Sequence, residues 1–321
     1  MQRISTIKTR LFLTIPLLSL LLIISQIANA ALKNGFDLSN SVIPVQEILA
    51  GGPPRDGIPA IDQPHFTPAN KNITLTATDR ILGITINGVS KAYPIAILNW
   101  HEIVNDRIDN KPIVISYCPL CGSGVAFSAA TKNTQYSFGV SGLLYNSDVL
   151  LYDRKTKSLW SQLLGKAISG PLQGTTLQQL PLTHTSWLDW YTRHPDSLVL
   201  TQKTGYQRDY KRDPYAGYSN RSSLIFPVNH EDSRYHAKEQ VLGIIINGQA
   251  KAWPFSELAQ TSGNIKEDLG GEKIKITYDD EHHSAAVFDS SGNRLNDTTT
   301  FWFAWFAFHP DTEVFIANNI K

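Results

Sequence analysis

The sequence has little cysteine and little charge. Of its 321 residues, only two are cysteine and 18% are charged. Two cysteines cannot form the several disulfides of a small secreted scaffold, and they cannot alone supply the four thiolates of a structural zinc or iron–sulfur site. The 42% of hydrophobic residues excludes a disordered chain, because enough apolar surface is available to offset the entropy of ordering. Any function of the two cysteines therefore involves a single pair.

Long apolar runs are also absent, except at the start of the chain. Three basic residues precede the apolar run 11–24, which is followed by Ala28-Asn29-Ala30, the small-x-small form of a signal peptidase site. We expect residues 1–30 to be a signal peptide that is cleaved after Ala30, with an uncleaved anchor as the alternative. The mature protein is then periplasmic or secreted. No later run approaches the roughly 20 residues of a membrane span, so we expect none in the mature chain.

The chain also has no large excess of positive or negative charge. Without residues 1–30 the chain has 26 basic and 28 acidic side chains. No basic stripe remains that could follow a phosphate backbone, so the sequence predicts no nucleic-acid partner. It identifies no other partner.

Two stretches of the chain repeat one pattern. Residues 82–88 read Leu-Gly-Ile-Thr-Ile-Asn-Gly, residues 242–248 read Leu-Gly-Ile-Ile-Ile-Asn-Gly, and each is followed at the same spacing by Lys-Ala-aromatic-Pro. Alternating apolar residues around Asn-Gly predict a β-hairpin closed by a type I′ turn. Each hairpin is followed by a helix-like stretch, at 95–105 and 255–265, and then by a strand-like one.

A further block extends the repeat. The spacing of Trp187, Trp190 and His194 recurs at positions 302, 305 and 309. Because both histidines precede Pro-Asp, the pattern favours a turn or helix-capping role for them. We therefore predict an α+β fold in which one module is duplicated.

The repeat also predicts how the chain is divided. The first copy carries an insert, residues 137–182, that the second copy lacks, and loops added to one copy of a scaffold often carry function. The predicted parts are the signal peptide 1–30, an N-terminal extension 31–74, the first repeat 75–200, a connector 201–235 and a second, degenerate repeat 236–321.

Both cysteines lie in one motif, Cys118-Pro119-Leu120-Cys121-Gly122, between two predicted strands. A thioredoxin-type motif needs a helix that begins at its first cysteine, and Gly122-Ser123-Gly124 is a poor first helical turn. A C-P-x-C-G turn between strands is similar to half of a rubredoxin or zinc-ribbon site, where the turn aims both sulfurs at one metal ion. Thiolate softness favours copper, zinc or iron, and the sequence does not choose among them.

One such turn needs further ligands, and His101 is the first candidate. It lies just ahead of the cysteine-bearing strand, and the second copy lacks this histidine and both cysteines together. Asp148, Asp153 and His65 are weaker candidates. The alternative for His101 is a packed histidine that has found a hydrogen-bond partner.

Three functions remain open. The first is a metal site formed by Cys118, Cys121 and His101, and the second is a thiol–disulfide oxidoreductase in which Cys118 is the nucleophile. The third is a non-enzymatic binding module, so the sequence does not decide whether the protein is an enzyme. An inert disulfide explains least, because a bridge across so short a loop removes little entropy from the unfolded chain.

Several motifs together resemble those of a prokaryotic family called domain of unknown function 3179. The resemblance covers nearly the whole mature chain. It implies an exported protein whose shared residues gather at His101, the cysteine pair and the insert, and it implies no particular reaction. The motifs are Asp56-Gly57-Ile58-Pro59, residues 99–106, Tyr117-Cys118-Pro119-Leu120-Cys121, residues 139–148, Tyr152-Asp153-Arg154, residues 158–162, and Arg208-Asp209-Tyr210 with Pro214-Tyr215.

Overall fold

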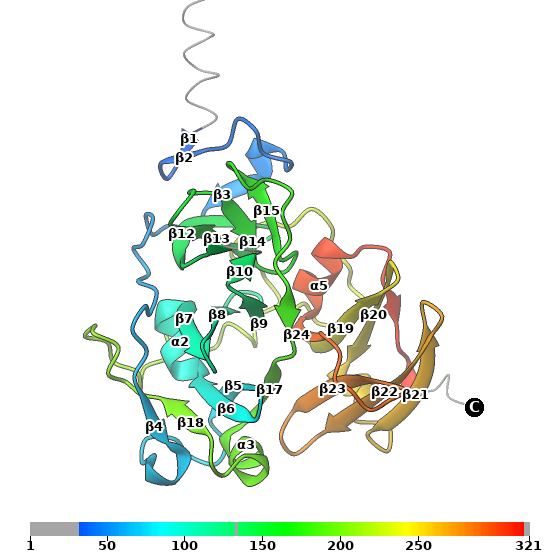
Figure 1. Cartoon of the computed structure of the whole chain (residues 1–321). Helices are drawn as coiled ribbons and strands as arrows, with labels where there is room; N and C mark the ends of the chain where they lie inside the picture. Colours follow the sequence, from blue (N-terminus) through cyan, green and yellow to red (C-terminus); the bar gives the residue numbers. More distant parts are fainter. Residues whose placement is uncertain (1–31, 132–133, 318–321) are drawn as a thin grey trace, which may run out of the picture.

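The computed structural model describes residues 32–131 and 134–317 (Figure 1). The structure is 42% strand and 11% helix, and it resembles a five-bladed β-propeller. The described residues form five sheets of three to five strands, together with two short two-stranded ribbons. The prediction of a duplicated α+β module was therefore wrong. The predicted signal peptide, residues 1–30, lies outside the described residues.

The fold class was mispredicted because the helix-like stretches contain only short helices. Helix α2 (Ile95–His101) and helix α4 (Phe255–Leu258) occupy the first part of each stretch. The backbone then turns left-handed, at Glu102 and at Gly263, and a strand begins at the next residue. Each stretch read as one helix is thus a short helix followed by the start of a strand.

Three sheets are built from the chain up to residue 200, and Figure 1 shows them one above another on the left. The first has the order β15-β14-β13-β12-β3, with β3 (Ile48–Ala50), β12 (Phe138–Tyr145), β13 (Asp148–Asp153), β14 (Leu159–Ser161) and β15 (Lys166–Ser169). The second has the order β16-β9-β8-β7, with β7 (Ile103–Ile108), β8 (Lys111–Cys118), β9 (Ser123–Ser128) and β16 (Gln179–Leu180). The third has the order β17-β5-β6-β18-β4, with β4 (Phe66–Pro68), β5 (Arg80–Ile86), β6 (Val89–Pro94), β17 (Thr183–Ser186) and β18 (Leu198–Leu200). The predicted insert thus supplies most of the first sheet.

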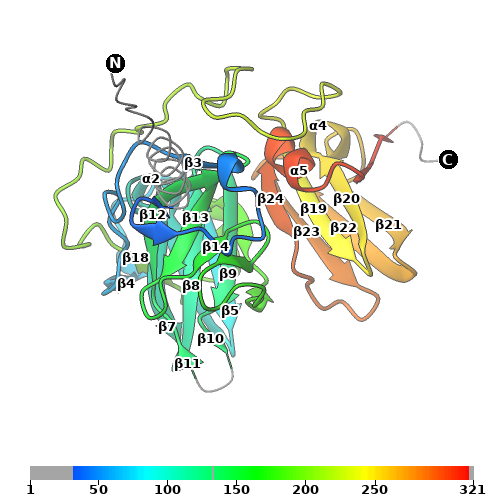
Figure 2. The same cartoon turned by 90° about the horizontal axis from the view of Figure 1, so that it is seen from above.

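The last two sheets follow residue 239 and lie beside the first three (Figure 1). The fourth has the order β24-β19-β20-β25, with β19 (Gln240–Ile246), β20 (Gln249–Pro254), β24 (Thr298–Phe301) and β25 (Glu313–Val314). The fifth has the order β21-β22-β23, with β21 (Asn264–Leu269), β22 (Glu272–Asp279) and β23 (Ser284–Asp289). Residues 201–239 contain no helix or strand, and Figure 2 shows this segment running over both groups of sheets.

The remaining elements are short. Helix α3 (Trp187–Arg193) follows β17, and helix α5 (Trp302–Phe308) follows β24. The two ribbons pair β1 with β2 and β10 with β11. Their strands and the two 3-10 helices are β1 (Leu32–Lys33), β2 (Phe36–Asp37), β10 (Ala130–Thr131), β11 (Thr134–Gln135), η1 (Val45–Glu47) and η2 (Ala69–Lys71).

Both predicted Asn-Gly hairpins are confirmed. Strand β5 pairs with β6 and strand β19 with β20, each antiparallel and in register across the turn. Asn87 and Gly88 have φ values of 50° and 81°, and Asn247 and Gly248 have 51° and 83°. Both central residues of each turn thus have positive φ, as a type I′ turn requires.

The third and fourth sheets share one pairing scheme. In each, a central hairpin is flanked by an antiparallel strand on one side and by a parallel strand on the other. A tryptophan from the following helix covers a glycine of the hairpin, because a Cβ atom at Gly83 would lie 2.3 Å from Trp190 and one at Gly243 would lie 2.4 Å from Trp305. Only glycine leaves room for the indole at these two positions.

The repeated histidines have the predicted capping position. His194 and His309 are the C-cap residues of α3 and α5. Their rings lie 4.1 and 4.3 Å from the rings of Trp190 and Trp305, measured between centroids. Both histidines therefore end a helix and pack on its tryptophan.

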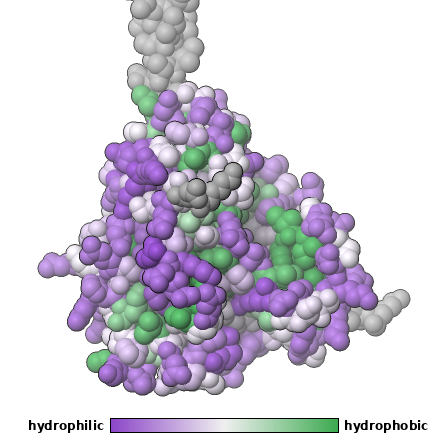
Figure 3. All heavy atoms as spheres, in the orientation of Figure 1, coloured by the Kyte–Doolittle hydropathy of each residue, from purple (hydrophilic) through white to green (hydrophobic). Residues whose placement is uncertain are grey.

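No helix in the described ranges is long and apolar enough to cross a membrane. The face of the molecule in Figure 3 is mostly hydrophilic, with smaller apolar areas.

Candidate metal centre

The cysteine motif forms a tight turn between two strands, as predicted. Cys118 is the last residue of β8, and the Cys121 N–H donates to the Cys118 carbonyl at 3.2 Å. Gly122 has a φ of +60°, and a Cβ atom there would lie 2.8 Å from the Phe301 ring, so the turn requires glycine. Both cysteines are buried and neither is in a disulfide.

A second hairpin tip meets this turn. Between β12 and β13, Asn146 and Ser147 have φ values of 50° and 63°, which are the two positions of a type I′ turn. Asp148 follows as the first residue of β13. One side-chain ligand atom from each of Cys118, Cys121 and Asp148 lies within 4.8 Å of the other two.

A backbone carbonyl adds a fourth donor atom. The Ser147 oxygen lies 3.8 Å from the Cys118 Sγ and 3.4 Å from the Cys121 Sγ. The two hairpin tips therefore bring together two sulfur and two oxygen atoms. The two thiolates with a carboxylate suit zinc or iron, which accept sulfur and carboxylate ligands together.

Buried hydrogen bonds hold the Asp148 carboxylate in place. The Leu163 N–H donates to its Oδ2 at 3.0 Å. The donors and acceptors around Gln162 orient its amide so that the nitrogen donates to Asp148 Oδ1 at 3.0 Å and the oxygen accepts the Cys118 N–H at 3.2 Å. Gln162 thus connects a carboxylate and a cysteine of the same group, as the outer hydrogen bonds of metal sites often do.

The site gathers acidic groups without a basic partner. Burial raises the pKa of both thiols, that of Cys121 well above its usual value. Burial also raises the pKa of Asp148 to about 7. In the described part of the chain, the ion pairs all lie away from these three residues. A bound cation is therefore what would favour the thiolate and carboxylate forms here.

Tyr218 is a neighbour that the sequence analysis did not single out. It is 7% exposed and belongs to the same apolar cluster as both cysteines. Its hydroxyl is buried and has no hydrogen-bond partner within the described ranges. Burial raises the pKa of Tyr218, and the charges of Cys121 and Cys118 raise it further.

His101 is not part of the three-residue group. Its Nδ1 lies 2.7 Å from the Pro59 carbonyl oxygen, and its Nε2 lies 2.7 Å from the Tyr210 hydroxyl. Burial lowers the pKa of His101. Both ring nitrogens have partners outside the cluster, and Asp148, the weaker candidate in the sequence, lies beside the sulfurs instead.

The other two weaker candidates also lie outside this group. The Asp153 carboxylate accepts hydrogen bonds from Thr156 and from the Trp160 indole. The His65 carbonyl accepts the Thr201 N–H. Neither residue shares a ligand-sized cluster with the cysteines.

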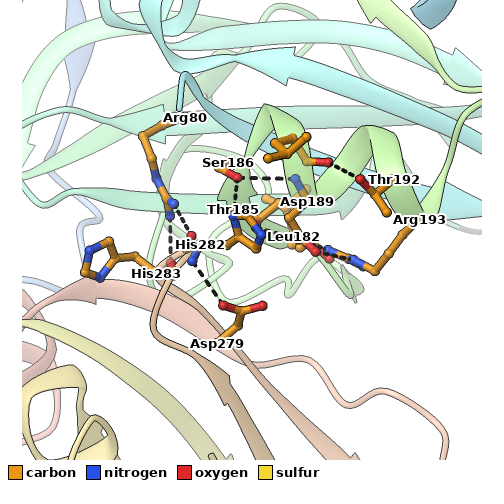
Figure 4. A network of polar contacts seen from close by, with 12 residues as sticks. Arg80, Leu182, Thr185, Ser186, Asp189, Thr192, Arg193, Asp279, His282 and His283 are labelled. Carbon is orange, nitrogen blue, oxygen red and sulfur yellow. Dashed lines mark hydrogen bonds and ion pairs between the residues drawn. The ribbon is translucent and has the colours of Figure 1, made fainter. Parts of the chain in front are cut away.

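The corresponding turn of the last sheet has a different chemistry. Asp279 and His282 occupy the positions of Cys118 and Cys121 between β22 and β23, and their ligand atoms lie within 4.8 Å of one from Asp189 (Figure 4). Asp189 is already ion-paired with Arg193.

The remaining hydrogen bonds of this network connect the turn between β22 and β23 to α3. The His282 Nδ1 lies 2.9 Å from the Ser186 hydroxyl, and Arg80 donates to the carbonyls of His282 and His283 (Figure 4). Ser186 is the N-cap of α3. Because these polar groups already have partners, we interpret the network as a structural contact between the two halves of the chain.

The sequence comparisons agree with the motifs. No curated protein and no solved structure matches the chain. The model of the family DUF3179, described as a protein of unknown function, matches residues 55–312. This match confirms the resemblance found in the sequence, and the chain belongs to the DUF3179 family.

Proposed function

We propose that Cys118, Cys121 and Asp148 bind one divalent cation, with zinc as the first choice. The observation that carries the proposal is the convergence of two sulfur atoms and a carboxylate oxygen within 4.8 Å. Zinc bonds of about 2.0–2.3 Å place tetrahedral ligands roughly 3.3–3.8 Å apart, so the three ligand atoms need to move little.

The donor set supports zinc or iron(II) over copper(I). Copper(I) is selected by soft sulfur ligands, whereas zinc accepts thiolate and carboxylate together. Here the sulfurs of Cys118 and Cys121 are accompanied by the Asp148 carboxylate and the Ser147 carbonyl. The Ser147 oxygen is the candidate for the fourth position.

Burial supports a structural role for the cation. Cys118 is 1% exposed and Cys121 is 0% exposed, and their ligand partners come from a hairpin of another sheet. A cation held between the two tips would join the first sheet to the second. Metal binding would then stabilise the fold, because the site forms only when the chain is folded.

The same burial argues against the oxidoreductase. A thiol that attacks a disulfide must be accessible and easily deprotonated. Burial raises the pKa of both thiols, which leaves them protonated at neutral pH when no cation is bound.

Metal analysis of protein purified under reducing conditions tests the proposal. We expect about one zinc per chain in the wild type, and less than about a tenth of this in Cys118→Ser and Asp148→Asn. Asp279→Asn, which changes an exposed carboxylate in the corresponding turn, is the matched control and should keep the metal. His101→Gln should keep it too, since both ring nitrogens have other partners.

Two results would overturn the metal site. One is a wild type without stoichiometric metal, and the other is a Cys118→Ser variant with as much metal as the wild type. If the metal-free wild type instead reduces protein disulfides and alkylation of Cys118 occurs below its ordinary pKa of about 8.5, the oxidoreductase takes its place.

A further inference from the structure

Glu102 holds a backbone conformation that does not suit it. It is the residue after α2, with φ 57° and ψ −27°, a left-handed region that favours glycine. Its N–H donates to the Leu98 carbonyl at 2.7 Å, and its carbonyl accepts the Tyr117 N–H at 2.8 Å. These two hydrogen bonds fix the strained conformation from both sides.

The second half of the chain has glycine at the corresponding position. Gly263 has a φ of +73°, and its carbonyl accepts the Tyr278 N–H at 2.8 Å, as that of Glu102 does for Tyr117. A strand begins at the next residue in both cases. This turn therefore needs no side chain, and the first half has a glutamate where the fold favours glycine.

Burial of the Glu102 side chain is also unfavourable for the stability of the fold. The residue is 6% exposed, so its carboxylate is largely removed from water. Burial and then the charge of Asp148 raise its pKa to about 8. Removing a carboxylate from water in this way disfavours its charged form and costs stability.

Glu102 lies beside the strand that carries Cys118. The Glu102 carbonyl accepts the N–H of Tyr117, the residue before Cys118, and the next residue, Ile103, pairs with Ser116 of β8. Glu102 therefore adjoins the strand that ends at Cys118, and its charge also raises the pKa of Cys118. Its carboxylate is not in the group whose ligand atoms lie within 4.8 Å of one another, so it would act on a bound cation through its charge without being a ligand.

We propose that Glu102 is a positioning residue of the metal centre, whose carboxylate makes the site select a divalent cation over copper(I). This inference rests on the proposed metal site. Coulombic attraction is proportional to the charge of the cation, so the same carboxylate attracts Zn²⁺ twice as strongly as Cu⁺ at the same distance. The fold tolerates the strain and the buried charge at this position because the site uses them.

Two substitutions separate this role from a structural one. Glu102→Gly removes both the strain and the buried carboxylate, and Glu102→Gln removes only the negative charge. The zinc affinity is measured by competition with a chromogenic chelator, the copper(I) affinity by competition with bicinchoninate, and the unfolding temperature with EDTA present. Glu281→Gln, which changes an exposed acid in the corresponding turn, is the control.

We expect Glu102→Gly to unfold at the same or a higher temperature than the wild type when no metal is bound. We also expect both variants to lose tenfold or more in zinc affinity and to lose less in copper(I) affinity. The inference is overturned if Glu102→Gly is less stable while zinc binding is unchanged, or if both variants keep the wild-type ratio of affinities. A wild type that binds no zinc would instead remove the metal site itself, so the two failures are distinct.

Discussion

The Cys121 carbonyl accepts the Phe301 N–H at 2.7 Å. The turn that carries the two thiols, which follows β8, is therefore anchored to β24 of the fourth sheet. The opposite contact also exists, because Arg80 of β5 donates to the turn between β22 and β23. Each half of the chain thus donates hydrogen bonds to a turn of the other half.

Thr300→Val tests the first of these contacts. The Thr300 hydroxyl donates to the same Cys121 carbonyl at 2.9 Å. Valine has nearly the same shape but no hydroxyl, so we expect a loss of about 1 kcal/mol in the free energy of unfolding, measured by urea denaturation. Thr299→Val is the control on the neighbouring residue. An equal loss in both variants would show that the hydroxyl contact to the cysteine turn has no special weight.

Arg80→Met tests the second contact. The burial of Arg80 lowers its pKa to about 10, and its guanidinium donates to the carbonyls of His282 and His283. Removing a charged donor from two carbonyls should lower the free energy of unfolding by about 2–3 kcal/mol. Hydrogen exchange should become faster in the turn between β22 and β23. Unchanged exchange there would mean that other contacts hold this turn.

Local patterns predicted local structure well. The turns at Asn87 and Asn247 followed from two adjacent residues, because positive φ at both is a property that Asn-Gly carries by itself. The cysteine turn followed in the same way. The propeller-like arrangement was not predictable from such patterns, since stretches such as 95–105 combine a short helix with a strand whose identity depends on its partners in the sheet.

The site was only partly predictable for a related reason. The cysteines are three residues apart, but Asp148 reaches them through the packing of two sheets, which no spacing in the sequence reveals. No pattern in the sequence pointed to Tyr218. Glu102 could have been found, because aligning the two halves at Tyr117 and Tyr278 places this glutamate opposite Gly263, at the end of a helix.

His309 predicts a loss of stability in acid. Burial lowers its pKa from the usual value of about 6.5 to about 4. Between these two values the unfolded chain binds a proton at this histidine and the folded chain does not, so the stability falls as the pH decreases from 6.5 to 4. His309→Gln should flatten the fall in unfolding temperature over this range. His230→Gln, in the exposed connector, should leave it as in the wild type, and the prediction fails if the two variants behave alike.

Asp148 and Glu102 predict a change of opposite sign in the metal-free protein. Burial raises their pKa values to about 7 and about 8, from the ordinary values of 3.8 and 4.5. Between about pH 4 and pH 8 the folded chain binds more protons at these carboxyls than the unfolded chain, so its stability decreases as the pH rises. Thermal unfolding in EDTA from pH 5 to pH 8 should show this slope, and Asp148→Asn and Glu102→Gln should each reduce it. Saturating zinc should reverse the slope, because the metal-bound folded chain keeps the Asp148 carboxylate and both thiols ionised, whereas the thiols of the unfolded chain are protonated in this range. A slope that persists unchanged in both variants would mean that other groups cause it.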